Sequence, residues 1–455
     1  MTVRPGLVLA TCCISLFLVS MDVTIVNVAL PAIARDLNAS VAGLQWAIDG
    51  YTLVIASFLM LAGSTADRLG RRRVFQTGLA VFSAGSLLCS LAPTIHGLVA
   101  FRIVQALGGA MLNPVAMSII VNTFTEPRAR ARAIGTWGAV FGISMALGPL
   151  LGGLLVDSVG WRAIFWINVP VALAAIVLTT KFVPESRAPT PRRFDPIGQL
   201  LIVVVLAGLV SALIEGPELG WYAPLVIAGL AAAAAAFATL IPYERRRREP
   251  LVELAFFKNP PFAAAIVLAV VAFSAFNGFL FLSSLYLQVA RGLSAARAGA
   301  QMLPVAVTLV ICAPLSGRLV GAGLARYALV GAGAAMTIAA LIMTGVGVTT
   351  SLVLVGVGYG LFGIGQGLVN TPITNAAVSG MPKEQAGVAS ALASTSRQVG
   401  ASLGVAIAGT VGHGTGFINT LHAYSWIVAG SGLTVIAIGI AATRRRGENG
   451  VSIAR

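Results

Sequence analysis

Charge and reactive side chains are scarce in this sequence. Only 10% of its 455 residues are charged, and lysine occurs only at positions 181, 258 and 383. None of these lysines belongs to a Gly-Lys-Ser/Thr sequence, so the chain has no Walker A loop and is not a self-contained ATP-driven motor. The three histidines lack metal-ligand spacing, and the four cysteines all lie in apolar runs. These absences argue against a metal site, a disulfide framework, an organic cofactor and, since no nucleophile stands beside a base, an enzyme.

Long apolar runs take up most of the chain. Hydrophobic residues make up 57% of it and its mean hydropathy is +0.91, which would leave too much apolar surface exposed in a soluble protein. The runs are continuous rather than alternating, which favours helices over strands. Because roughly 20 apolar residues cross a bilayer as a helix, we predict an all-α integral membrane protein with about 14 transmembrane helices. The predicted spans are residues 6–30, 42–65, 74–92, 97–122, 133–156, 163–182, 196–215, 222–241, 262–287, 297–320, 326–347, 351–374, 386–410 and 424–443.

Two longer polar connections divide these spans into groups. Residues 183–195 are rich in proline, and residues 242–261 contain four consecutive arginines. Between them lie two spans. We therefore predict an N-terminal six-helix bundle at 1–183, two inserted transmembrane helices with cytoplasmic linkers at 184–261, and a C-terminal six-helix bundle with a short tail at 262–455. A faint repeat, GSTADRLGR from residue 63 and PLSGRLVG from residue 314, supports this order, because parallel repeats are a known transporter architecture.

The basic residues fall mostly on one side of the predicted topology. If the N-terminus is cytoplasmic, 24 of the 30 lysines and arginines are cytoplasmic, four are external and two lie within spans. This bias follows the positive-inside rule and argues against nucleic-acid binding, despite the net charge of +15. We expect a multi-pass protein of the cell membrane with both termini in the cytoplasm.

Three ionisable residues lie inside predicted spans. At 1.5 Å per residue, Asp22, Asp49 and Arg102 fall roughly 8 to 12 Å from the outer ends of their helices, in one layer of the membrane. A charge in hydrocarbon costs several kcal/mol and usually marks an ion or proton pathway. Burial disfavours an ionised carboxylate and a nearby guanidinium favours it, so a change in their separation would move a proton. The alternative is a static pair that merely holds helices together.

Several distinct motifs lie around these residues and farther along the chain. They are MDVTIVNVALP at 21–31, GSTADRLGRRR at 63–73, LVAFRIVQALGGA at 98–110, and in the fifth span Gly135, Ser144 and GPLLGG at 148–153. In these motifs the chain resembles the major facilitator superfamily, specifically its 14-span drug:proton antiporter branch, over essentially its whole length. Ala106 and Ser144 stand where the family pattern usually has glycine, but both are small enough to keep helices close.

The resemblance implies a role for each motif. Asp22 and Arg102, with Asp49 beside them, would couple proton movement to transport. The loop after the second span would act as a cytoplasmic gate, with Gly63, Asp67, Arg68, Gly70 and Arg71 as its key residues. Gly148, Pro149, Gly152 and Gly153 would form the antiporter motif, a hinge and proton-leak seal specific to exporters. The simpler alternatives are a basic loop that only sets topology and glycines that only pack.

Polar and aromatic residues within the spans are candidates for a substrate cavity, although a structural hydrogen bond or an interfacial anchor explains any single one equally well. The set is Trp46, Tyr51, Gln105, Asn113, Asn277, Tyr286, Gln366, Asn370 and Arg397. Arg397 is expected near mid-membrane, where an unpaired arginine would be expensive.

These observations and the resemblance together predict a monomeric, proton-coupled secondary transporter. It would adopt the major facilitator fold and export drugs, antibiotics or similar amphipathic small molecules by alternating access, with the proton as coupling ion. The alternatives are an exporter or importer of a specific metabolite or amino acid with the same fold, a membrane sensor, or an intramembrane enzyme.

Overall fold

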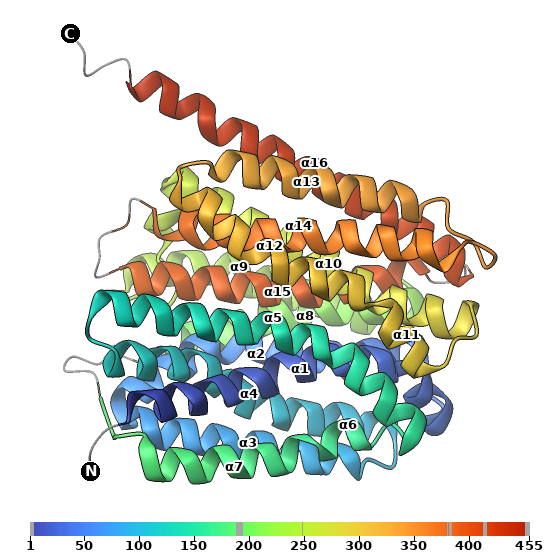
Figure 1. Cartoon of the computed structure of the whole chain (residues 1–455), viewed down its shortest axis with the longest axis horizontal. Helices are drawn as coiled ribbons and strands as arrows, with labels where there is room; N and C mark the ends of the chain where they lie inside the picture. The colour runs from blue at the N-terminus through green and yellow to red at the C-terminus, as the bar shows by residue number, and fades with distance from the viewer. Residues whose placement is uncertain are drawn as a thin grey trace. The chain divides into compact units, whose positions relative to one another are not determined.

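The computed structural model describes residues 4–187, 194–247, 249–379, 381, 385–412 and 416–450, with side chains for all of these except 127, 131, 386 and 442–450. Every regular element in these ranges is helical (Figure 1). Of the basic residues assigned above to the cytoplasmic side, Arg192, Arg193, Arg248, Lys383 and Arg455 lie outside the described ranges.

The chain divides into two compact units. The first comprises residues 1–252 and 293–300, and the second comprises 253–292 and 301–455. The helices of the first unit are α1 (Pro5–Leu37), α2 (Val41–Leu69), α3 (Arg71–Ser90), α4 (Ile95–Thr123), α5 (Pro127–Ser158), α6 (Ala163–Trp166), α7 (Asn168–Phe182), α8 (Pro196–Leu219), α9 (Pro224–Arg246) and most of α11 (Ala295–Gln301). Those of the second are η1 (Leu254–Lys258), α10 (Pro260–Leu285), η2 (Tyr286–Ala290), α12 (Leu303–Gly321), α13 (Ala325–Met343), α14 (Leu352–Val378), α15 (Ala386–Gly412) and α16 (Phe417–Gly450).

Twelve helices in the described ranges are long and apolar enough to cross a membrane, where α6 with α7, α10 with η2, and α11 with α12 each count as one span. Each coincides with a span predicted from the sequence. The two remaining predicted spans, 74–92 and 386–410, are also helical, as α3 and α15. They are less apolar because α3 begins with three arginines and carries three serines, and α15 contains Arg397 among serines and threonines. The fold is therefore an all-α bundle of about 14 membrane-length helices, since each is long enough to span the hydrocarbon core.

Capping residues explain where several helices begin and end. Ser40 and Thr94 accept hydrogen bonds from the backbone N–H groups of Gly43 and Gly97, at 3.2 and 3.1 Å, and so cap α2 and α4. Proline occupies the first turn of α1, α5, α8 and α9, where its missing N–H costs nothing. Helix α1 ends at Asn38, whose left-handed φ of 48° turns the chain into α2.

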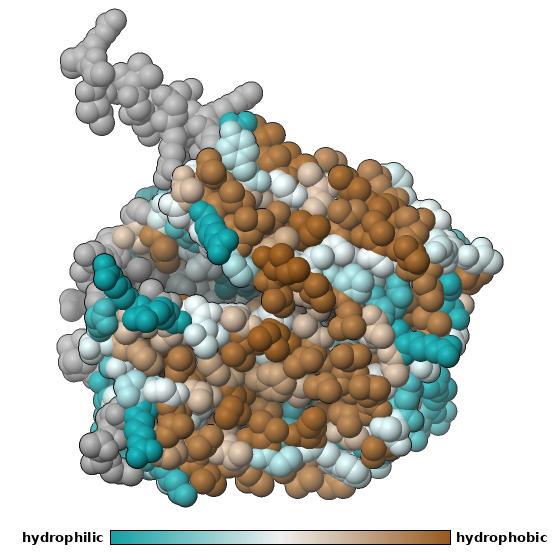
Figure 2. Space-filling view, viewed as in Figure 1, coloured by the Kyte–Doolittle hydropathy of each residue, from teal (hydrophilic) through white to brown (hydrophobic). Residues whose placement is uncertain are grey.

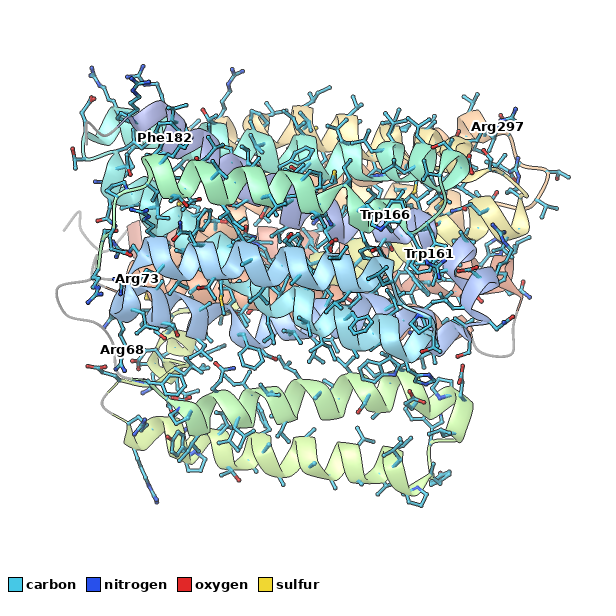
Figure 3. The ribbon with its side chains drawn as sticks, turned by 90° about the horizontal axis from the view of Figure 1, so that it is seen from below. Arg68, Arg73, Trp161, Trp166, Phe182 and Arg297 are labelled. Atoms are coloured by element: carbon cyan, nitrogen blue, oxygen red, sulfur yellow. The ribbon has the colours of Figure 1, made fainter. Side chains whose placement is uncertain are left out.

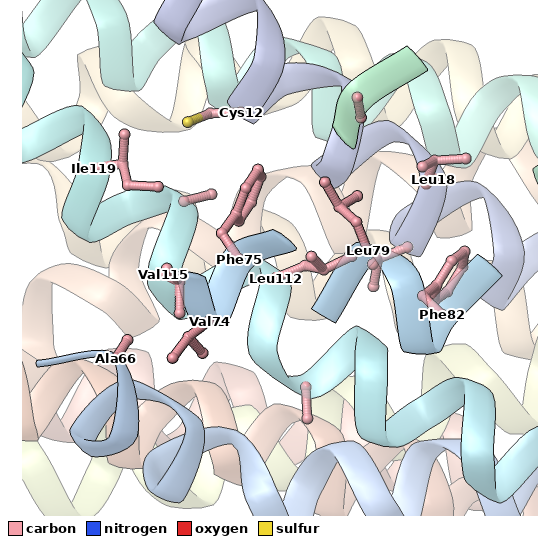
Figure 4. Close-up of a cluster of buried hydrophobic side chains, with 14 of the residues drawn as sticks. Cys12, Leu18, Ala66, Val74, Phe75, Leu79, Phe82, Leu112, Val115 and Ile119 are labelled. Carbon is pink, nitrogen blue, oxygen red and sulfur yellow. The ribbon is translucent and has the colours of Figure 1, made fainter. Parts of the chain in front are cut away.

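The core of the first unit lies between α1, α2, α3 and α4. Figure 4 shows its apolar side chains, among them Phe75, Leu79 and Phe82 of α3 and Leu112 and Val115 of α4. Helices α3 and α4 approach closely because both carry glycine at their crossing: a Cβ on Gly85 would lie 2.5 Å from the backbone of Gln105. Small residues at such crossings are the usual device for packing helices in membranes.

Helices α8 and α9 pack side by side, and α8 also packs against α2. Figure 3 shows the two helices as a hairpin. Two polar contacts fasten it. The side-chain amide of Gln199 donates to the backbone C=O of Ser57 at 2.5 Å, and Trp46 Nε1 donates to Glu215 Oε1 at 2.7 Å. The inserted helices are therefore an integral part of the first unit.

Apolar side chains also cover much of the surface. Leu173, Leu200 and Ile311 are all more than half exposed, and Figure 2 shows brown, apolar residues across the viewed face with hydrophilic ones gathered toward its edges. A water-soluble protein rarely exposes apolar area on this scale, whereas lipid chains satisfy it.

Candidate proton-coupling site and gate

The centre of the candidate site is a buried ion pair between α1 and α4. Arg102 Nη1 donates to Asp22 Oδ2, and the two side chains are 2% and 0% exposed. Two charges this deep carry a large desolvation cost, which close pairing offsets only when further hydrogen bonds complete the group. The structure thus brings into direct contact two residues that the sequence predicts in one layer of the membrane.

Neutral polar side chains complete the shell of Asp22. Gln105 Nε2 and Asn168 Nδ2 both donate to Asp22 Oδ1, at 2.8 and 3.1 Å. The same two amides donate to the hydroxyl oxygen of Ser86, at 3.1 and 3.0 Å. Asp22 thus accepts three hydrogen bonds, from α4 and α7, while Ser86 of α3 steers two of the donors. This is an environment built for a carboxylate.

Arg102 makes four further contacts. Its Nε donates to the backbone C=O of Ala47 at 3.1 Å, and its Nη1 donates to Gln105 Oε1 at 2.7 Å. The guanidinium also lies 4.0 Å from the centre of the Tyr51 ring and 5.8 Å from that of Phe165. Cation–π contacts of this kind stabilise a desolvated guanidinium by about 2 kcal/mol. Contacts other than the ion pair with Asp22 therefore also hold Arg102 in place.

Asp49 is fully buried on α2. The hydroxyl of Thr52, one turn later on α2, lies 3.3 Å from Asp49 Oδ1. Helix α2 contacts Arg102 through the backbone C=O of Ala47 and the ring of Tyr51. The structure therefore brings Asp22 and Arg102 together, and Asp49 lies on a helix that contacts Arg102.

The depth estimate for Asp22 was too shallow. Helix α1 extends to Leu37 rather than ending at residue 30, which puts Asp22 roughly 22 Å from the helix end at 1.5 Å per residue. The predicted span ends at residue 30, just before Pro31, but this proline lies inside α1 and does not end the helix.

Sequence reasoning missed two members of this network, Ser86 and Asn168. Asn168 is the only side-chain amide in the apolar stretch 163–182, which was a usable signal. The break between α6 and α7 at Ile167 places it at the start of α7, facing Asp22. Ser86 gave no signal, because serine is common in this helix and its role depends on which side faces α4.

The gate motif forms a compact turn at the end of α2. Gly70 adopts φ +112°, which only glycine adopts without strain, and a Cβ there would lie 2.6 Å from Glu185 Oε1. Arg71 closes back on Asp67 with an ion pair of 2.8 Å. Gly63 has only Pro114 nearby, and Arg68 is exposed. The motif is thus a fixed local structure in which Arg68 and Arg73 are exposed.

The segment after α7 seals this turn. Arg71 N donates to the C=O of Ser186 at 2.9 Å, and Arg72 N donates to Glu185 Oε1 at 3.1 Å. Figure 3 shows Arg68 and Arg73 at the same end of the first unit as Phe182, with Trp161 and Trp166 at the opposite end. Glu185 was not among the predicted site residues, yet its carboxylate accepts a hydrogen bond from the backbone of this motif.

The antiporter motif packs directly on the helix 1 motif. A Cβ on Gly148 would overlap Thr24 Oγ1, and one on Gly152 would lie 2.7 Å from Cγ1 of Ile25. Gly153 has the same relation to the backbone of Ala295 in α11. Because Thr24 is less than one turn from Asp22, α5 lies against the part of α1 that carries Asp22.

A methyl group at Gly148 should therefore disturb α1. We expect Gly148→Ala to lower the free energy of unfolding by about 1 to 3 kcal/mol through overpacking. Gly138→Ala in the same helix is the matched control, because nothing lies within 4 Å of a Cβ there; it should be neutral or slightly stabilising. Melting of the two purified variants in detergent compares them, and equal melting temperatures would contradict the close α1–α5 contact.

The cavity candidates of the first unit have different surroundings. Tyr51 and Gln105 belong to the ion-pair network, and Trp46 is bonded to Glu215 of α8. Asn113 is half-buried, and its Oδ1 has no hydrogen-bond partner among the described residues. Within this group, the hydroxyl of Tyr51 and Oδ1 of Asn113 are the buried polar atoms without a hydrogen-bond partner among the described residues.

Those of the second unit divide in the same way. Tyr286 is structural, because its hydroxyl donates to the C=O of Gly347 at 2.9 Å and accepts from Arg291. Asn277 donates to the C=O of Phe273 in its own helix. Three candidates of the second unit remain: Gln366, Asn370 and Arg397.

Arg397 is the most unusual of these. It donates to Ser394 and Thr374, lies 5.8 Å from the Phe273 ring centre, and has no carboxylate partner among the described ion pairs. Gln366, 4% exposed, has an Oε1 without a hydrogen-bond partner in the described part of the chain. Asn370 is half-buried one turn before Thr374. On α14 and α15, Arg397 is thus hydrogen-bonded to neutral hydroxyl oxygens, whereas Oε1 of Gln366 has no hydrogen-bond partner among the described residues.

Several characterised proteins are similar to this chain in sequence. It is 40% identical over 398 residues to the multidrug resistance protein Stp of Mycobacterium tuberculosis, covering 88% of this chain and 74% of that one. It is 36% identical to the methylenomycin A resistance protein of Streptomyces coelicolor, covering 93% and 87%. It is 38% identical to the tetracenomycin C resistance and export protein of Streptomyces glaucescens, covering 90% and 76%.

Solved structures share the fold at low sequence identity. The human organic anion transporter MFSD10 matches with a TM-score of 0.65 and 16% identity, covering 95% of this chain and 99% of that one. The POT family transporter PepTSo matches with a TM-score of 0.68 and 17% identity, covering 96% and 98%. The sequence model described as Major Facilitator Superfamily matches residues 12–405. The chain therefore belongs to the Major Facilitator Superfamily of membrane transporters.

Proposed function

We propose that this protein is a proton-coupled secondary transporter that exports drugs, antibiotics or similar amphipathic compounds from the cytoplasm by alternating access. The observation that carries the proposal is the buried Asp22–Arg102 pair with its shell of amides. Replacing a buried ion pair by apolar residues is often neutral or stabilising. A pair kept in a membrane helix bundle therefore indicates a role in moving charge.

The geometry supports a proton switch at Asp22. In this conformation the carboxylate accepts from Arg102, Gln105 and Asn168, so it has no need of a proton. A helix movement that separated α1 from α4 would remove these donors, and the isolated carboxylate would then bind a proton. Arg102 would stay in place on Tyr51 and Ala47. Proton uptake and release at Asp22 would thus follow the transport cycle.

The direction and the substrate class rest on the relatives. All three similar proteins named above are resistance proteins, and one is named as an export protein. The glycines of α5 pack on α1 beside Asp22, as a motif that restrains proton leakage would require. We propose further that the protein works as a monomer in the cell membrane with both termini in the cytoplasm, and that it needs no cofactor besides the coupling proton.

We also propose the domain organisation suggested by the sequence, in which α8 and α9 are an insertion between two six-helix bundles. The proposed substrate-contacting residues are Asn113, Gln366, Asn370 and Arg397. Three of them have a polar atom without a hydrogen-bond partner among the described residues, and Asn370 is half-buried. Asp49 is proposed as an accessory acid on the proton pathway.

Transport by the purified protein in proteoliposomes tests this function. An imposed pH gradient should drive movement of a fluorescent lipophilic cation such as ethidium, and a protonophore should abolish it. Transport that continues at the same rate after the gradient is collapsed would refute proton coupling. Failure with ethidium but gradient-driven movement of an amino acid would favour the metabolite exporter instead.

A further inference from the structure

Two buried acids lie at the foot of the α8–α9 hairpin, away from the Asp22 site. Asp195 immediately precedes α8 and Glu244 lies in the last turn of α9. They are 6% and 2% exposed. Both residues belong to the first unit. Acids so completely buried are rare unless they are paired or protonated.

One oxygen of Asp195 is fully satisfied. Asp195 Oδ1 accepts from the backbone N–H of Gly198 at 3.0 Å, which caps α8, and from the hydroxyl of Tyr243 at 2.7 Å. The guanidinium of Arg247 lies 3.3 Å from the same oxygen. One oxygen of Glu244 is satisfied too: Oε2 accepts from the backbone N–H of Leu251 at 2.9 Å.

The other oxygen of each acid is unpartnered. Asp195 Oδ2 and Glu244 Oε1 are buried without a hydrogen-bond partner among the described residues. Both point to the same place. A Cβ built on Gly198 would lie 2.8 Å from each of them, so the two oxygens converge on the space above a glycine that has no side chain to fill it.

Among the residues that the structure describes, the charges around this space do not balance. Arg247 is the described cation that contacts the pair, and its side chain is 39% exposed. Arg245 and Arg246 are exposed on the last turn of α9, and Tyr243 contributes a neutral hydroxyl. Helix α2 meets this end of α8 through the backbone C=O of Ser57. Two buried carboxylates thus face one half-exposed guanidinium, and two carboxylates that share one site cannot both stay ionised.

We propose that Asp195 and Glu244 form a second proton-binding site, in the inserted helix pair, which holds one proton between Glu244 Oε1 and Asp195 Oδ2 at neutral pH. The proton supplies the missing positive charge and gives each unpartnered oxygen a hydrogen-bonded role, with Glu244 as donor and Asp195 as acceptor. Tyr243, Arg247 and the N–H of Gly198 stabilise Asp195 as the ionised member.

The proton at this site also affects how the segment after α9 is held. Glu244 holds the chain that leaves α9 through the N–H of Leu251. Loss of the proton would leave two like charges above Gly198, and the repulsion would push Glu244 away from Asp195 and loosen that segment. The inserted hairpin therefore responds to alkaline pH at this end of the protein, independently of Asp22.

Infrared spectroscopy of the purified protein tests the site directly. A protonated carboxyl group has a C=O stretch distinct from that of a carboxylate, and ordinary exposed glutamates are ionised above about pH 6. The wild-type protein should show such a band at neutral pH that disappears on titration to about pH 9. Labelling glutamate with carbon-13 should shift the band, which assigns it to a glutamate without any substitution.

Substitutions then locate the proton. Glu244→Gln should remove the band and reduce proton release over this pH range by one proton per molecule, and Asp195→Asn should shift the band. Glu249→Gln is the matched control, because Glu249 is exposed five residues later; it should leave the band intact. The band should persist in Asp22→Asn, which separates this site from the proposed transport site.

The outcomes are decisive. Absence of a glutamate carboxyl band in the wild-type protein would overturn the proposal, as would a band that survives Glu244→Gln. A band that sodium ions abolish would also overturn it, because a metal cation would then occupy the space. If Glu244→Gln does not fold, the carbon-13 shift and Asp195→Asn still decide.

Discussion

Replacing Asp22 by asparagine is expected to reduce gradient-driven transport to the level of empty vesicles. Asparagine has nearly the same shape as aspartate but carries no titratable proton, so the switch between a bonded and a protonated carboxyl is lost. The measurement is uptake of a fluorescent cation into proteoliposomes under an imposed pH gradient. Substrate binding in detergent should survive, because Asp22 is committed to Arg102, Gln105 and Asn168 and has no bond left for a ligand.

The matched control is Asp36→Asn in the same helix. Asp36 pairs with Arg162 at 2.5 Å in a half-exposed position, where an ion pair contributes about 0 to 1 kcal/mol. This variant should transport at the wild-type rate. If Asp22→Asn transports as well as Asp36→Asn, Asp22 is only a structural member of the ion pair.

The largest effect on stability is expected from removing Arg102 alone. Arg102→Gln leaves the Asp22 carboxylate 0% exposed without a cation, which costs about 3 to 5 kcal/mol. The double variant Asp22→Asn/Arg102→Gln has no buried charge left and should recover most of that loss. Neither should transport. Melting of the single and double variants in detergent gives the coupling energy as a double-mutant cycle.

A rescue of stability without a rescue of transport would separate the two roles of the pair. If the double variant is as unstable as Arg102→Gln, the stability comes from the contacts of Arg102 with Ala47 and Tyr51 rather than from the charges. If the double variant transports, the pair is dispensable for coupling.

Hydropathy was sufficient for the helices but not for their details. Each predicted span coincides with a helix, because an apolar run in a membrane has no alternative that satisfies its backbone. The breaks at Ile167 and Met302, and the π-helical turn from Tyr286, were not predicted. They arise where neighbouring helices accept a local change in geometry, which a hydropathy pattern does not record.

The site was predictable to the extent that charge is rare. Asp22 and Arg102 stood out as charges in apolar runs, and the structure pairs them. Gln105 was expected in a substrate cavity, and the structure places it in the ion-pair network. Ser86 shows why such assignments fail: a polar residue is common in a helix, and only packing decides which polar residues face one another.

The inserted hairpin was where sequence reasoning reached least. Asp195 and Glu244 lie 49 residues apart in polar flanks, where acids are expected in water. Their burial results from the packing of α8 on α9 and from the missing side chain at Gly198. A pattern of hydropathy cannot reveal that two such ends meet.

Proton release on substrate binding is the most direct measurement of the central claim. In weakly buffered detergent solution, adding a transported cation to the purified protein should release protons from the wild type and none from Asp22→Asn, at equal occupancy of substrate. Equal proton release from both proteins would show that the coupling proton resides elsewhere and would contradict the account.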